Sequence, residues 1–325
     1  MRIRNLCSGV VAAAIAAAVT APIAAEDSKA LEVLAGARQA IGGRKLDALK
    51  TLTLEASLQR NVNTMQLNSD VEILLELPDK YLRSDTSSGM MASTMSTGFN
   101  GEKAIRPAGA TAMAGGGMII RMGPGGPMPS GEKPSPEEQE RLDQQMLRSA
   151  RADLSRLMLG WFATAHPAIN AEYSYAGEAE SPDGKAVVID AKNADGFSAR
   201  LFIDHETKLP LMVTYRGPQP RIVTQGGPRP GGTATRGGGQ EPVRREMTEE
   251  ERKKMREDAD RQIKELQSQP PTQVDFALYF EDWREVDGVK FPHKIRRAVS
   301  GATNEEWTIT RVKVNPKIDA RKFEG

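Results

Sequence analysis

The chain has 325 residues, of which 44 are basic and 43 acidic, so its formal net charge at pH 7 is +1. This balance argues against binding to nucleic acid or to an anionic membrane surface. Cys7 is the only cysteine and lies near the N-terminus, so disulfides, thiolate catalysis and cysteine metal sites are excluded from the remainder of the chain.

The N-terminus has the pattern of a secretory signal. Arg2 and Arg4 precede an alanine-rich apolar run at residues 10–19, and the small residue Ala25 stands before an acidic pair. We predict that residues 1–25 are a cleaved signal peptide, because the apolar run is short for a membrane span. Without the two leader arginines the mature chain has 42 basic and 43 acidic residues, a net charge of −1. Export of a chain without cysteine indicates the bacterial periplasm or cell surface, and we expect the periplasm.

The first part of the mature chain predicts a helix followed by antiparallel strands. Ser28 is placed to cap a helix that ends near Ile41. Alternating apolar residues predict strands at 51–59 and 70–77. Asn100-Gly101 lies between two further strand-like runs and predicts a two-residue hairpin turn.

A low-complexity segment and a long helix come next. Residues 107–135 are rich in glycine, alanine, methionine and proline, and we expect a disordered insertion there. Ser135 and Glu138 form a capping-box pattern before apolar residues at helical spacing. The C-terminal part of this helix, residues 154–162, is the most apolar, so we predict that it covers the sheet.

The second half of the chain contains four more strand patterns, then a second insertion and a charged helix. The strand patterns lie at residues 173–179, 186–191, 198–204 and 210–216, the expected disordered insertion at 217–247, and the charged helix at 248–267. Two domains are possible from length alone, but these insertions favour one domain over residues 26–325.

The C-terminal stretch predicts three long antiparallel strands. Val274, Phe276, Leu278 and Phe280 alternate with mostly polar residues, and Asp287-Gly288 predicts the turn into a second strand. A third strand follows at residues 306–314, before a proline that cannot donate to a sheet. One apolar face of these strands must be covered by another element.

Several strand and turn motifs occur together in a known combination. They are Phe202-Ile203-Asp204, Leu209-Pro210-Leu211, Asp282-Trp283-Arg284, Val286-Asp287-Gly288-Val289-Lys290-Phe291-Pro292-His293 and Val312-Lys313-Val314-Asn315-Pro316, with Ala40-Ile41-Gly42-Gly43 near the start. This set resembles bacterial outer-membrane lipoprotein-sorting proteins, relatives of the LolA/LolB carriers. The resemblance implies a mainly β (α+β) fold, in which a curved antiparallel sheet or half-open barrel is capped by helices and holds acyl chains. The two insertions and the charged helix are additions to that pattern.

Few residues suit metal binding or catalysis. His166, His205 and His293 have no metal-ligand spacing, so we expect structural or solvent-facing roles and no metal. Seven methionines between residues 90 and 128 could bind Cu(I), but without nearby histidine or cysteine a flexible apolar lip is the favoured interpretation. We interpret the Asp282/Glu285 and Glu305/Glu306 pairs, at expected hairpin ends, as solvated turn residues.

We therefore predict a non-enzymatic protein without a cofactor that binds lipid or lipoprotein acyl chains between the sheet and the long helix. The predicted cavity residues are Leu157, Trp161, Phe162, Phe276, Leu278, Phe280, Trp283, Phe291, Ile295 and Trp307. The same side chains could instead fill the core themselves. In that case the alternative is an envelope module that binds another protein and no ligand.

Overall fold

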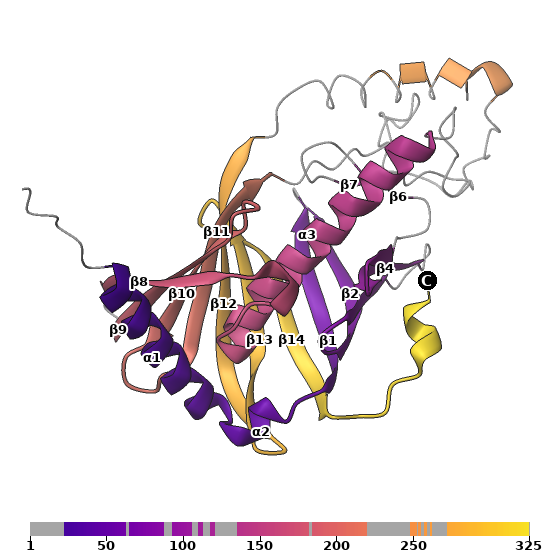
Figure 1. The fold of residues 1–325 in the computed structure, drawn as a ribbon. Helices are drawn as coiled ribbons and strands as arrows, with labels where there is room; N and C mark the ends of the chain where they lie inside the picture. The colour runs from indigo at the N-terminus through magenta and orange to yellow at the C-terminus, as the bar shows by residue number, and fades with distance from the viewer. Residues whose placement is uncertain are drawn as a thin grey trace, which may run out of the picture.

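The alternating segments of both chain halves join into one antiparallel sheet. In the computed structural model the strands are β1 (Thr51–Val62), β2 (Met65–Glu76), β3 (Lys80–Ser87), β4 (Ser93–Asn100), β5 (Lys103–Ile105), β8 (Glu172–Ser181), β9 (Gly184–Lys192), β10 (Ser198–Asp204), β11 (Pro210–Pro218), β12 (Gln273–Val286), β13 (Val289–Val299) and β14 (Ala302–Val314). Their order is β5-β4-β3-β2-β1-β14-β13-β12-β11-β10-β9-β8. The sheet is curved and open, with β5 and β8 at its edges (Figure 1). The predicted curved antiparallel sheet is confirmed.

The structure describes residues 23–62, 65–87, 93–105, 110–112, 118–120, 135–181, 184–219, 248–251, 253–254, 257–258, 261 and 272–324. Most of the predicted signal peptide and most of both predicted insertions lie outside this part of the chain. Within the first insertion β6 (Ala110–Ala112) pairs with β7 (Met118–Ile120). In the predicted charged helix, the described residues after Thr248 are helical and exposed. None of the helices described is long and apolar enough to cross a membrane.

Two predicted turns set the register of their hairpins. Asp287 and Gly288 have φ angles of 53° and 81° and join β12 to β13. Gly101 has a φ of 59° in the turn between β4 and β5. Positive φ is the conformation that a tight hairpin turn requires, so both predictions are confirmed.

The first strand of the sheet pairs with the last. Leu52 lies opposite Val314 in the antiparallel pair of β1 and β14. Asn315, with a φ of 53°, fixes the end of this pair. Its Oδ1 accepts hydrogen bonds from the backbone N–H groups of Lys50 at 2.7 Å and Thr51 at 3.2 Å. The two ends of the domain are therefore held together in the middle of the sheet.

Three α-helices cover the concave side and its lower end: α1 (Ile23–Ile41), α2 (Arg44–Asp47) and α3 (Pro136–Phe162). The predicted capping box of α3 is confirmed, because Ser135 Oγ accepts from Glu138 N at 3.2 Å and Glu138 Oε2 accepts from Ser135 N at 2.9 Å. The predicted N-cap at Ser28 is wrong. α1 begins upstream, where alanines favour the helix, so Ser28 lies inside it.

α3 crosses the concave face of the sheet diagonally (Figure 1). It packs against β4 and β5 on one side and β10 and β11 on the other. Buried side chains begin at Leu147, so the first turns extend past the sheet. Arg151 ties the helix to the β4–β5 turn, donating to Glu102 Oε1 at 2.6 Å and to the Gly101 carbonyl at 3.2 Å. The predicted cover of the sheet by this helix is confirmed.

His166 has a structural role at the end of α3, as expected. Its Nδ1 accepts from Ala168 N at 3.2 Å, so the ring proton is on Nε2, which donates to the Pro78 carbonyl. Burial lowers the pKa of His166, so the ring is neutral at pH 7. In the described part of the chain no group of three or more His, Cys, Asp or Glu side chains could hold a metal ion.

Candidate ligand-binding site

A cavity of about 200 Å³ lies between the middle of α3 and the concave face of the sheet. We call it the arginine cavity, defined by Arg83, Arg156 and Arg297 together with Leu157, Ile295 and Trp307. One face of α3 forms its upper wall, because the lining residues of the helix recur at three- and four-residue spacing. β3, β4 and β11–β14 form the opposite wall.

The ten residues predicted to form an apolar site do not all meet at this cavity. Four of them, Leu157, Leu278, Ile295 and Trp307, line it. Trp161, Phe280 and Phe291 instead fill the packed core and are 0, 2 and 0% exposed. Phe276 stacks on Tyr215 with ring centroids 4.9 Å apart, Trp283 is half-buried, and Phe162 lines a second hollow.

Gly160 explains why the lower part of the interior is solid. A Cβ atom at this position would lie 1.9 Å from Cζ of Phe280. The absence of a side chain therefore allows α3 to rest directly on the aromatic ring of β12. The space that the sequence assigned to a ligand is occupied here by the protein's own aromatic side chains.

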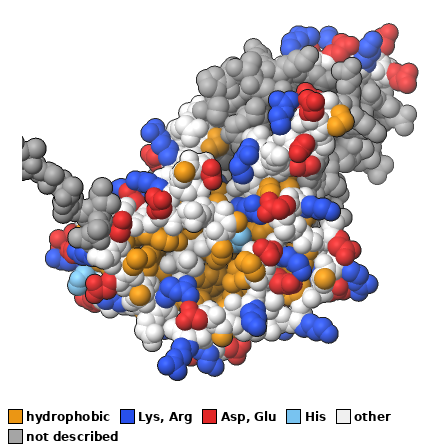
Figure 2. Space-filling view, viewed as in Figure 1, with side chains coloured by type: hydrophobic (Ala, Val, Ile, Leu, Met, Phe, Trp, Pro, Cys, Tyr) orange, Lys and Arg blue, Asp and Glu red, His pale blue; other side chains and the backbone are white. Residues whose placement is uncertain are grey.

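The second hollow, of about 320 Å³, lies between α1, α2 and the C-terminal end of α3. We call it the end groove, defined by Leu46, Leu77, Met158 and Phe162. Figure 2 shows apolar side chains gathered on the surface between α1 and the lower end of α3. Arg38 borders the groove and donates to the carbonyl of Phe162 at 3.1 Å, which ties α1 to the end of α3.

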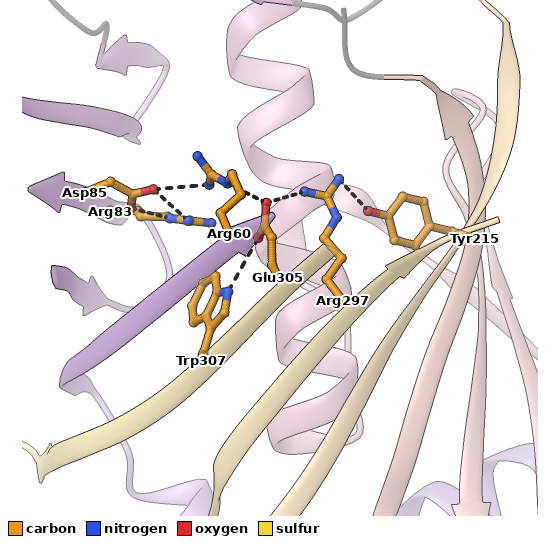
Figure 3. Close-up of polar contacts among 7 residues, drawn as sticks. All are labelled: Arg60, Arg83, Asp85, Tyr215, Arg297, Glu305 and Trp307. Carbon is orange, nitrogen blue, oxygen red and sulfur yellow. Dashed lines mark hydrogen bonds and ion pairs between the residues drawn. The ribbon is translucent and has the colours of Figure 1, made fainter. Parts of the chain in front are cut away.

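A row of charged side chains crosses the sheet beside the arginine cavity. Register places Arg60 opposite Glu305, and Glu305 opposite Arg297, on β1, β14 and β13. Glu305 is only 5% exposed. Its Oε1 accepts from Arg60 Nε at 3.0 Å and from Arg297 Nη1 at 3.3 Å (Figure 3). The next inward-facing position on each of these strands, two residues away, is apolar. On β14 that position is Trp307.

Arg83 extends this network to β3. It forms a two-pronged pair with Asp85, at 2.7 and 2.8 Å, and Asp85 lies 3.6 Å from Arg60. The Arg83 guanidinium also lies 4.4 Å from the centre of the Trp307 ring, a cation–π contact. The tryptophan is thus the point where the apolar row and the charged row meet.

The charges around the cavity are held in fixed states at neutral pH. Burial alone would raise the pKa of Glu305, but the nearby Arg60, Arg297 and Arg83 outweigh it and lower that pKa, so the side chain is a carboxylate. Burial raises the pKa values of the Tyr81 and Tyr215 hydroxyls, so both phenols are neutral. These groups can bind and orient a polar ligand, which is the chemistry of a binding site.

Sequence reasoning missed the polar half of this site. Glu305 was expected to be a solvated turn residue, and this was wrong because β14 begins at Ala302 and carries Glu305 into the sheet. The signal was present in the alternation. Arg297 follows Ile295 by two residues and Glu305 precedes Trp307 by two, so both charges occupy inward-facing positions.

No protein-family model matches the sequence, and no curated protein matches it either. Similar solved structures include a LolA superfamily protein from Nitrosomonas europaea, 8% identical, with 90% of this chain and 96% of that chain covered and a TM-score of 0.45. A DUF1329 family protein from Desulfovibrio piger is 10% identical, with 94% and 98% covered and a TM-score of 0.40. A domain from Vibrio parahaemolyticus, described as an outer membrane lipoprotein-sorting protein, is 9% identical, with 91% and 97% covered and a TM-score of 0.39. At these identities the likeness is one of fold.

Proposed function

We propose that this protein is exported to the periplasm and carries lipid, or the acyl chains of lipoproteins, in the bacterial envelope without a covalent step. The observation that carries the proposal is the arginine cavity, a hollow between one helix and a curved sheet whose walls combine apolar side chains with a few charged ones. The sequence motifs that resemble the LolA/LolB carriers support the same function.

Leu157, Leu278, Ile295 and Trp307 supply the apolar contact surface for a chain. Each methylene group buried there would contribute about 0.8 kcal/mol. Burying ten of them would contribute about 8 kcal/mol, from which the cost of association must be subtracted. The cavity, at about 200 Å³, is below the roughly 300 Å³ at which pockets for whole small molecules begin. It therefore fits part of one acyl chain, and a longer chain requires α3 to move away from the sheet.

Binding of the uncharged apolar dye N-phenyl-1-naphthylamine, followed by its fluorescence, tests this function. Ala150 is half-buried and lines the cavity, so Ala150→Phe fills the space with an aromatic ring. We expect the wild-type protein to bind the dye and this variant to bind it at least ~10-fold more weakly, because about two methylene equivalents of contact are lost. Gln144→Phe, at an exposed position of the same helix, is the matched control and keeps wild-type binding.

Native mass spectrometry of protein purified gently from the periplasm provides a second readout. A carrier retains lipid mass, and Ala150→Phe reduces it. Protein that carries no lipid and binds no dye would contradict the proposal and favour the alternative, an envelope module that binds another protein. Equal dye binding by wild type and Ala150→Phe would exclude the arginine cavity as the binding site.

A further inference from the structure

Two guanidinium groups from opposite walls of the arginine cavity meet at one tyrosine. Arg156, on α3, lies over the ring of Tyr215 at 4.0 Å from its centre. Arg297, on β13, donates from Nη2 to the Tyr215 hydroxyl at 3.5 Å, and this contact is drawn in Figure 3. Both arginines line the cavity. The helix and the sheet thus place cationic groups at the same end of the hollow.

These two arginines have hydrogen-bonding capacity that the described residues do not use. Each guanidinium carries five N–H donors. The Nε groups of Arg156 and Arg297 are buried and have no hydrogen-bond partner in the described part of the chain. The bonds of Arg297 to Glu305 and Tyr215 are long, at 3.3 and 3.5 Å. Arg156 Nη1 donates to Asp153 Oδ1 at 2.6 Å. The remaining terminal N–H groups of both arginines, on the cavity wall, suit a ligand that brings acceptor oxygens.

The charge of the lining indicates what kind of acceptor fits. Three arginines (Arg83, Arg156 and Arg297) and two carboxylates (Asp153 and Glu305) line the cavity. Asp85, paired with Arg83, and Arg60, paired with Glu305, add one charge of each sign, so one positive charge remains in excess. A monoanion balances this excess, and a dianion such as a phosphate monoester does not. A carboxylate also matches the planar guanidinium through two parallel hydrogen bonds.

We propose that the arginine cavity binds the carboxylate of a long-chain fatty acid, with Arg297 and Arg156 donating to the carboxylate oxygens. The hydrocarbon chain then lies along Leu157, Ile295 and Trp307, next to the charged row. This inference rests on the proposed function, because it names the headgroup of the lipid whose chain the cavity holds. The small volume of the cavity restricts the ligand to a single chain.

The test compares the fluorescent fatty acid cis-parinaric acid with its methyl ester, which has the same chain without the charge. We expect the wild-type protein to bind the acid about 10- to 100-fold more tightly than the ester, the range that one charge-assisted hydrogen bond spans. Arg297→Gln removes this preference by weakening acid binding and leaves the affinity for the ester unchanged. Arg156→Gln, which keeps Arg297 and the network around Glu305, reduces the preference in the same direction.

Arg60→Gln is the matched control, since Arg60 also bonds to Glu305 but does not line the cavity. It keeps the wild-type preference for the acid. Equal affinity of the wild-type protein for acid and ester would overturn the headgroup site while leaving the carrier function intact. If the wild-type protein binds none of the three probes, the acid, the ester or the apolar dye, both the headgroup site and the carrier function are overturned. Acetate added in excess should not displace the acid, and displacement would indicate a site for small free anions instead.

Discussion

Gly160 sets the distance between α3 and the sheet, and replacing it with alanine tests that role. The added Cβ atom would lie 1.9, 2.2 and 2.4 Å from Cζ, Cε2 and Cε1 of Phe280. Carbon atoms pack at about 3.5 to 4.0 Å, so the ring or the helix must move by more than ~1 Å. Phe280 is 2% exposed, so its ring is enclosed by the packed core. We expect the helix to lift from the sheet.

Two terms of opposite sign determine the stability of Gly160→Ala. Overpacking of a core costs about 1 to 3 kcal/mol, whereas alanine favours a helix over glycine by about 1 kcal/mol. The clash is close and the site is closed, so we expect the free energy of unfolding to fall by about 1 to 2 kcal/mol. Gly36→Ala measures the helix preference of alanine over glycine without a clash, because no atom lies within 4 Å of a Cβ at Gly36 on α1. That variant should be more stable than wild type by about 0.5 to 1 kcal/mol.

Urea unfolding followed by circular dichroism measures all of these values. Phe280→Leu provides the test of mechanism, because leucine leaves room for the new methyl group. The double variant Gly160→Ala/Phe280→Leu should lose less stability than the sum of the single variants, by about 1 kcal/mol or more. If Gly160→Ala stabilises the protein as Gly36→Ala does, or if the two substitutions are additive, the contact between Gly160 and Phe280 does not position α3.

Two further predictions concern the sheet. Glu305→Gln should lower the free energy of unfolding by about 1.5 to 3 kcal/mol at pH 7, because the partly buried Arg60 and Arg297 lose the carboxylate to which they donate. Since folding lowers the pKa of Glu305, its stabilisation is complete above its ordinary value of 4.5 and is lost as pH falls through the folded value. The difference between wild type and Glu305→Gln in urea unfolding should therefore narrow below pH 4.5, and a constant difference would contradict this assignment. Asn315→Ala should lower the free energy of unfolding by about 0.5 to 1.5 kcal/mol, because two solvent-exposed backbone N–H groups exchange their acceptor for water. Faster amide exchange at Lys50 and Thr51 should accompany the loss.

The elements that depend on local pattern could be predicted from the sequence. Alternation located the strands, Asp287-Gly288 located a hairpin turn, and the Ser135 capping box located the start of α3. The pairing of β1 with β14 could not be predicted, because no local signal specifies which distant strands become neighbours. The start of α1 was missed because a capping residue is informative only where the preceding residues disfavour a helix, and alanines precede Ser28.

The candidate site was predicted only on its apolar side. Leu278 and Trp307 were found because apolar residues at inward positions are expected to be buried, and that rule does not say whether they meet a cavity or another side chain. Phe280 packs on Gly160, a contact that requires the two elements to be placed in space. Arg297 was missed because this rule considers only apolar residues. Its position in the alternation nevertheless indicates that it faces inward.

The neighbouring positions of β1 and β14 also determine when this protein can fold. Until β14 has been synthesised, β1 and β13 both lack a partner along one side, and the sheet remains in two halves. Contacts between such distant residues form slowly, and unpaired strands attract one another in incomplete chains. The complete sheet therefore forms only after β14 has been added to the chain. For a polypeptide threaded through a secretion channel in extended form, that delay would be an advantage.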